Sequence, residues 1–222
     1  MKLTPAREEI DHRTIKLIVG LIAVSLGTLT AHFAYVDTGS DIASISESYY
    51  VGGWSQSFFV GCLFAIGAFL MAYNGLTFTE MVLSKIASFA AVGVALFPCQ
   101  CNNELEIIPH LHAAAAAAMF IVLACFCYIF FRRASLKGHT QANMRAGIYA
   151  LCGIAMILSL LVLAFDGISG GTLTEKIPRL TFYGEHTGLI AFGISWLTAS
   201  RVLPFITRED ERFSLLTPSA SK

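Results

Sequence analysis

Residues 181–197 read TFYGEHTGLIAFGISWL, and this stretch decides how the chain is interpreted. Its apolar character is that of a membrane-spanning helix, except that Glu185 and His186 stand side by side near its start. A charged side chain inside a membrane costs about 3 kcal/mol or more unless it has a partner. A carboxylate at this position therefore indicates a functional group whose partner lies elsewhere in the chain.

The composition as a whole is that of a membrane protein. The 222 residues are 55% hydrophobic and only 14% charged, and the mean hydropathy is +0.66. Soluble domains carry about 25% charged residues. The net charge is zero and no basic tract is present, so a nucleic-acid partner is not expected.

Six apolar stretches of about 20 residues are each long enough to cross a hydrocarbon core of about 30 Å. They predict an all-α fold, a polytopic membrane protein with a single six-helix transmembrane bundle over residues 15–200. A segment 1–14 precedes the bundle, and a tail 201–222 follows it. The predicted helices cover 15–36, 56–74, 80–98, 110–131, 146–165 and 180–200.

The placement of the basic residues predicts the orientation. All but two of the 15 Lys and Arg residues lie on the side that holds both termini, and the two exceptions are Lys176 and Arg179. Because basic residues favour the cytoplasmic side, both termini are expected in the cytoplasm, with a bacterial inner membrane as the expected location. The connectors on this side look ordinary. The acidic, Ser-rich and Gly-rich loops are expected to face the periplasm or the cell exterior.

Histidine and carboxylate side chains gather near the predicted outer ends of the helices. Such a set suits zinc or a similar divalent ion, and it also suits general acid–base chemistry. The residues expected to form the metal site are His32, His112, Asp166, Glu185 and His186.

Helical geometry orders these candidates. At 100° per residue, small residues form a stripe from Gly184 to Ala199, and such stripes mark close packing of membrane helices. Glu185 then borders the interior, whereas His186 points toward lipid headgroups. His112 is the imidazole expected to meet Glu185. The stripe could pack within one bundle or between protomers, so a homodimer is one expectation.

The first outer loop adds hydroxyl groups in SISESYY, residues 44–50. Ser46 is the expected catalytic partner of Glu185 and His112, and Tyr50 and Tyr183 are expected to contact a substrate. The sequence contains no G-x-S-x-G and no H-E-x-x-H motif, so the usual hydrolase signals are absent.

Cysteine usage gives one further signal. Most of the six cysteines fall inside apolar runs, where cysteine usually acts as a small hydrophobic residue. Cys99-Gln-Cys101 is a weak signal for a metal ligand pair or a disulfide.

The segments SISESYY, VGVALFPC, HLHAAAAAAMF and GEHTGLIAFGISWL together resemble a family of uncharacterised bacterial six-helix membrane proteins. More distantly, the layout is similar to the Frag/DRAM/Sfk group, whose first outer loop also carries a serine-bearing segment. The resemblance covers about residues 15–201 and implies a six-helix fold with His112 and Glu185 as the matching polar residues. The family has a basic–acidic pair before its second helix, where this chain has Trp54-Ser55-Gln56.

A second similarity is to the CREST membrane hydrolases, which gather histidines, an acid and a serine near one membrane face. Members of that group normally have seven helices and paired histidines in the last one, whereas this chain offers Glu185 and His186 in a sixth.

Three hypotheses about function follow. The first is a metal-dependent hydrolase that acts on a lipid or amphiphile, with the ion lowering the pKa of a bound water. The second is a non-catalytic lipid-binding or sensory protein in which the same residues form a buried network. The third is a small transporter with Glu185 as its proton site. All three place the chain in a lipid bilayer with a lipid-like or small ligand.

Overall fold

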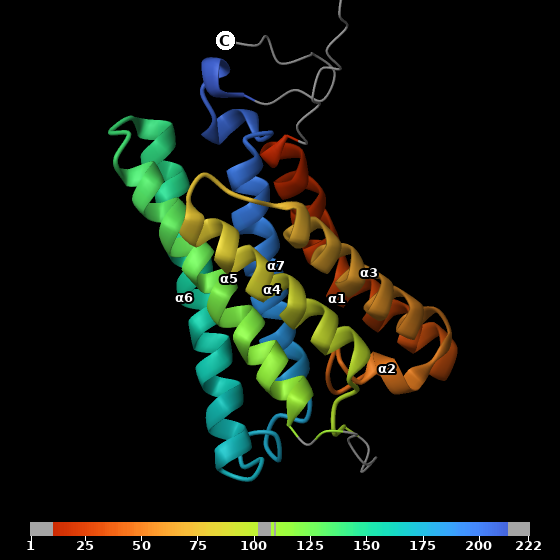
Figure 1. Ribbon diagram of the computed structural model, residues 1–222. Coiled ribbons are helices and arrows are strands. Elements are labelled where there is room, and N and C mark those ends of the chain that lie inside the picture. The colour runs from red at the N-terminus through yellow and green to blue at the C-terminus, as the bar shows by residue number, and fades with distance from the viewer. Residues whose placement is uncertain (1–10, 102–107, 109, 213–222) are drawn as a thin grey trace, which may run out of the picture.

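The computed structural model describes residues 11–101, 108 and 110–212, and this part of the chain folds entirely into helices and connecting loops (Figure 1). The predicted all-α class is thereby confirmed for the described residues. The long helices are α1 (His12–Thr38), α3 (Gly53–Ala72), α4 (Phe78–Leu96), α5 (Leu111–Ser135), α6 (Thr140–Ile168) and α7 (Leu180–Ser200). The short helices are α2 (Ser48–Val51) and the 3-10 helices η1 (Pro204–Ile206) and η2 (Glu209–Glu211).

Each predicted apolar stretch coincides with one long helix, but several helices begin earlier than the apolar pattern indicates. α6 begins at Thr140, because the side chain of His139 accepts a hydrogen bond from the backbone N–H of Ala142 and caps the helix. The side chain of Asp11 caps α1 in the same way. A capped first turn is polar, so hydropathy alone places the start too late. The helix α2 was not predicted.

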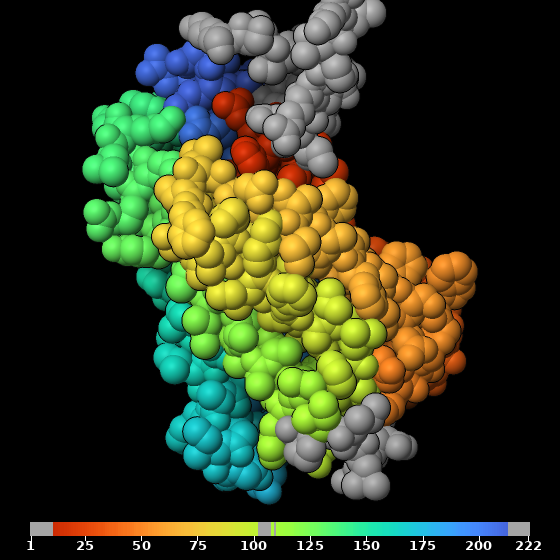
Figure 2. Space-filling view, viewed as in Figure 1, coloured from red at the N-terminus to blue at the C-terminus, as the bar shows by residue number. Residues whose placement is uncertain are grey.

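The six long helices form a closed ring. Each packs against its neighbour in the order α1, α3, α4, α5, α6 and α7, and α7 returns to α1. Figure 1 shows α7 behind α4 and α5, between α1 and α6, and Figure 2 shows that α4 and α5 cover the middle of α7 from this side. α7 is therefore buried on more than one face.

Small residues allow this close packing of α7. A Cβ atom built on Gly193 would lie 2.4 Å from Cγ2 of Val24 on α1 and 2.8 Å from the carbonyl oxygen of Gly20. On another face, a Cβ on Gly188 would lie 2.4 Å from the ring of Phe120 on α5. Small residues on two faces of α7 thus pack within the bundle, and Gly188 is the one of this pair that belongs to the predicted stripe.

An aromatic cluster fills the core toward the end of α7. Trp196 is fully buried, and its ring lies 5.3 to 6.3 Å, centroid to centroid, from four other rings. Those rings belong to Tyr73, Phe126, Phe130 and Phe192. Pairs of this kind stabilise a core beyond their buried area, and here they tie α7 to the ends of α3 and α5.

Five of the described helices, α1, α3, α4, α5 and α6, are long and apolar enough to cross a membrane. Large apolar side chains cover their outer surfaces, as Phe89, Leu151 and Leu161 show with exposures of 59 to 69%. Exposed apolar surface on this scale marks a membrane protein. α7, which carries Glu185 and His186, has the length of a span but is not among these five.

Candidate functional site at the outer end of the bundle

We call the end of the bundle that holds the start of α7 the outer end, and the opposite end, where α1 begins, the inner end. Glu185 lies in the second turn of α7, and its carboxylate is bound by the loop between α1 and α2. Oε2 accepts hydrogen bonds from the backbone N–H groups of Ile45 at 2.5 Å and Ser46 at 3.4 Å. The Oγ of Ser46 donates to Oε1 at 3.0 Å. Hydrogen bonds to a charged acceptor are stronger than neutral ones, so Glu185 has the partner that its position requires.

The same loop is attached to the start of α7 at three further points. The backbone N–H of Phe182 donates to the carbonyl of Ala43 at 2.9 Å, and Nε of Arg179 donates to the carbonyl of Ile42 at 3.2 Å. Arg179 also forms an ion pair with Asp41 at 2.9 Å. The loop therefore closes the outer end of the bundle against α7.

His112 lies in the first turn of α5 and holds a different loop. Its Nδ1 is 2.7 Å from the carbonyl oxygen of Phe97, at the end of α4, and the residue is only 7% exposed. A ring nitrogen at this distance from a carbonyl donates its proton. His112 thus joins α5 to the segment that follows α4.

Glu185, Ser46 and His112 border one small cavity of about 30 Å³. This volume accommodates about two water molecules. In the described residues, the hydrogen bonds of Glu185 run to the first outer loop and that of His112 runs to Phe97, so the two groups share a cavity without sharing a bond. The other lining residues are Leu26, Ile45, Phe59, Leu63, Val94, Ala116, Met119, Phe120 and Leu189.

Two predicted ligands are engaged elsewhere. His32 is exposed on α1, where its ring meets Phe33 edge-on. Asp166 is buried near the end of α6 and accepts hydrogen bonds from the backbone N–H groups of Leu173 at 2.7 Å and Thr174 at 3.1 Å. Asp166 therefore organises the loop between α6 and α7.

The predicted orientation of His186 toward lipid headgroups is wrong. Its ring stacks on Phe182 at 5.4 Å and points at α1, where a Cβ built on Gly27 would lie 2.5 Å from Nδ1. The prediction assumed that α7 has one buried face, whereas α7 packs on α1 as well as on α5 and α6. Nδ1 of His186 is buried and has no hydrogen-bond partner in the described part of the chain.

The tyrosines and cysteines of the outer end differ in their contacts. The hydroxyl of Tyr50 donates to the carbonyl of Cys99 at 2.7 Å, while Tyr183 is 52% exposed at the start of α7. Cys99 and Cys101 form a disulfide, and Sγ of Cys101 lies 3.6 Å from Oγ of Ser44. The Cys-Gln-Cys segment could have been a metal ligand pair or a disulfide, and in the structure it is a disulfide.

The described side chains do not form a metal site. Within residues 11–101, 108 and 110–212, no group of three His, Cys, Asp or Glu side chains is close enough to hold an ion. A catalytic zinc takes three protein ligands, and here Glu185 is bound to a loop and His112 to a carbonyl. The acidic residues of 102–107 lie outside the described residues, and the zinc site stays a prediction.

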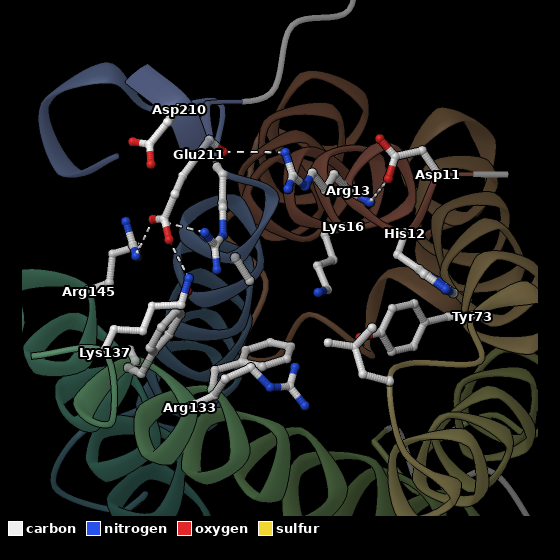
Figure 3. Close-up of a pocket in the computed structure, with 16 residues that line it drawn as sticks. Asp11, His12, Arg13, Lys16, Tyr73, Arg133, Lys137, Arg145, Asp210 and Glu211 are labelled. Atoms are coloured by element: carbon white, nitrogen blue, oxygen red, sulfur yellow. Dashed lines mark hydrogen bonds and ion pairs between the residues drawn. The ribbon is translucent and has the colours of Figure 1, made fainter. Parts of the chain in front are cut away.

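A larger cavity of about 410 Å³ lies at the inner end (Figure 3), where the sequence predicted no site. Its lining includes Lys16 and Arg145, which are 8% and 2% exposed. Lys16 gave a signal in the sequence, because it stands within the predicted helix 15–36, whereas Arg145 precedes the predicted helix 146–165 and is helical only because α6 begins at Thr140.

Comparisons with protein-family models, with curated proteins and with solved structures find no match to this chain. The resemblances to known families remain expectations. Function is therefore inferred from the geometry of the chain itself.

Proposed function

We propose that this is a six-span integral membrane protein that binds a lipid or lipid-like amphiphile without transforming it. α7 is the sixth span in this proposal, because its 21 residues extend about 30 Å and it packs between α1 and α6. With α1 beginning and α7 ending at the inner end, that end faces the cytoplasm and Glu185 faces the periplasm or the cell exterior.

The binding of Glu185 by a loop is the observation that favours a non-catalytic role. A general base must reach the proton that it removes from a substrate or a water. Both carboxylate oxygens of Glu185 already accept hydrogen bonds from Ile45 and Ser46, and the cavity beside them, at about 30 Å³, is too small for a substrate larger than water. We therefore call Glu185, Ile45 and Ser46 the outer latch, a group that keeps the bundle closed.

An apolar groove between α5 and α6 supports lipid binding. Its volume is about 570 Å³, within the range of about 300–1,000 Å³ typical of ligand sites. Both helices are among the five that are able to cross a membrane, so the groove lies at the level of the hydrocarbon. An acyl chain matches its surface. The lining is Ile121, Ala124, Cys125, Cys127, Tyr128, Phe131, Tyr149, Ala150, Gly153, Ile154, Ile157 and Leu158.

Native mass spectrometry of the full chain, released from membranes in mild detergent, tests this proposal. We expect the wild type to retain lipid, and Ala150→Phe, which fills the groove, to retain several-fold less. Leu161→Phe is the matched control, because it adds the same ring to the same helix at an exposed site outside the groove.

Metal analysis of the same preparations tests the alternative, a metal-dependent hydrolase. Equal lipid retention by wild type and Ala150→Phe would remove the groove from the proposal. Stoichiometric zinc that disappears in Glu185→Gln would restore the hydrolase hypothesis.

A further inference from the structure

The cavity at the inner end is strongly cationic. Six basic and three acidic side chains line it, together with His12 and several aromatic and apolar residues. It lies where the start of α1, the ends of α5 and α7, the start of α6 and the helix η2 meet (Figure 3). The basic residues are Arg13, Lys16, Arg133, Lys137, Arg145 and Arg201, and the acidic residues are Asp11, Asp210 and Glu211.

A carboxylate of the chain itself occupies part of this cavity. Glu211, on η2, accepts hydrogen bonds or ion pairs from Arg145 at 2.9 Å, from Arg201 at 2.9 Å and from Lys137. The guanidinium of Arg145 also donates to the carbonyl of Ile206 at 2.7 Å. Three cations thus converge on one carboxylate, which shows that this side of the cavity accepts an anion and that the anion present carries less charge than its surroundings.

Lys16 extends the excess of positive charge into the cavity. It is 8% exposed, and its ammonium lies 5.3 Å from the ring of Tyr73 and 5.0 Å from that of Phe130. Figure 3 shows the side chain reaching into the cavity from α1. Among the described residues its ammonium has these ring contacts but no hydrogen bond or ion pair. A buried ammonium without an anionic partner is unfavourable.

The nearest buried acid, Glu80, attracts the ammonium of Lys16 but forms its bonds with other groups. Glu80 is fully buried and is paired with Arg133, and it also accepts hydrogen bonds from Tyr73 and Thr77. Asp210 pairs with Arg208 at 3.2 Å and is mostly exposed. Asp11 accepts a hydrogen bond from the backbone N–H of Arg13 at the start of α1. The acids around the cavity are therefore bonded to other groups, and among the described residues no anion forms a hydrogen bond or ion pair with Lys16.

We propose that this cavity binds a phosphate-bearing anion, which contacts Lys16 and competes with the carboxylate of Glu211 for Arg145 and Arg201. A phosphate carries more charge than a carboxylate, and arginine side chains bind it through paired hydrogen bonds. The volume of about 410 Å³ accommodates a phosphorylated headgroup or a small soluble phosphate. The site lies at the opposite end of the bundle from the outer latch and does not depend on the proposed function.

Binding of two probes by the full chain tests the proposal. One probe is inorganic phosphate in solution, and the other is phosphatidic acid in phosphatidylcholine nanodiscs. Glu211→Gln removes the competing charge but keeps the shape of the side chain. Whichever of the two probes binds the wild type, we expect this variant to bind it about tenfold more tightly. Binding of phosphate in solution identifies a soluble ligand, and binding in the nanodiscs alone identifies a lipid headgroup.

Charge variants in the Glu211→Gln background locate the site. Lys16→Met should lose the binding, whereas Arg132→Gln should keep it, because Arg132 is an exposed cation at the same end of α5 and lies outside the cavity. If Lys16→Met does not fold, Arg201→Gln replaces it, with the same expected loss.

Two results would overturn the proposal. One is the absence of binding of either probe by both the wild type and Glu211→Gln, and the other is a Lys16 or Arg201 variant that binds as tightly as its parent. The cavity would then be only a clasp for the C-terminal segment. Lipid retention in the groove is measured separately with Ala150→Phe, so neither result bears on it.

Discussion

Oγ of Ser46 lies 3.0 Å from Oε1 of Glu185, and this bond joins the first outer loop to the last long helix across 139 residues of sequence. Replacing Ser46 with alanine removes the donor but leaves the two backbone N–H groups. We expect the free energy of unfolding to fall by about 1 kcal/mol, measured by thermal or chemical unfolding in detergent. Ser57→Ala is the control, because that exposed hydroxyl bonds only within its own helix, and its effect should be near zero.

The imidazole of His112 is expected to matter for stability more than that of His32. His112→Ala removes the 2.7 Å hydrogen bond to Phe97 and enlarges the neighbouring cavity, so we expect a loss of about 2 kcal/mol in the free energy of unfolding. His32→Ala, on the exposed face of α1, should change it little. Equal effects of the two substitutions would show that the bond to Phe97 contributes nothing.

The contact between α1 and α7 should not tolerate an added methyl group. Gly193→Ala would place Cβ against Val24 and the backbone of Gly20, and overpacking of this kind costs about 1–3 kcal/mol. Gly61→Ala on α3 is the matched control, because its Cβ would meet open space and alanine favours a helix by about 1 kcal/mol over glycine. Unfolding temperatures should therefore move in opposite directions, and a Gly193→Ala protein as stable as the wild type would argue against this packing.

The ion pairs of Glu211 with Lys137, Arg145 and Arg201, which we call the clasp, predict that the stability of the protein depends on pH. Burial alone would raise the pKa of Glu211, but the hydrogen bond from Lys137 and the charge of Arg201 outweigh it and lower the pKa from 4.5 to about 2. A carboxyl with a lowered pKa stabilises the fold above its unfolded pKa, and the contribution is lost as the pH falls through the folded pKa. The stability that Glu211 provides should thus be complete above about pH 4.5 and decline toward about pH 2.

Comparison of wild type and Glu211→Gln measures this effect. The difference between their unfolding temperatures should be larger near neutral pH than at about pH 3, since at pH 3 the carboxyl of Glu211 is protonated in the unfolded chain and folding must then release that proton. Glu209→Gln, an exposed acid on the same short helix, should show no such dependence. A difference for Glu211→Gln that does not change with pH would contradict the clasp.

Hydropathy predicted the helices well and the contacts of their polar residues poorly. The apolar runs located all six long helices, because burial in a membrane or a core requires the same side chains along each helix. The same pattern identified Glu185 and His112 as interior residues, and both border one cavity. It did not show that the backbone N–H groups of Ile45 and Ser46 bind Glu185, because a backbone N–H group has no signature in the sequence, whereas the hydroxyl of Ser46 was an expected partner.

The wrong orientation of His186 and the missed inner cavity have another cause, because a sequence pattern does not show which helices lie next to one another. A helical projection gives the angle between His186 and the small residues of α7, but it does not say how many neighbours surround the helix. Lys16 and Arg145 were counted as cytoplasmic charges that orient the chain. Their burial in one cavity follows from the meeting of α1, α6 and η2, which lie far apart in the sequence.

A double-mutant cycle on Ser46 and Glu185 tests the outer latch most directly. The free energy of unfolding is measured for wild type, Ser46→Ala, Glu185→Gln and the double variant, with Glu175→Gln as a control for an exposed outer acid. The latch predicts that the two substitutions are coupled by about 1 kcal/mol, so that Ser46→Ala costs less once Glu185 is neutral. Strict additivity of the two substitutions would contradict it.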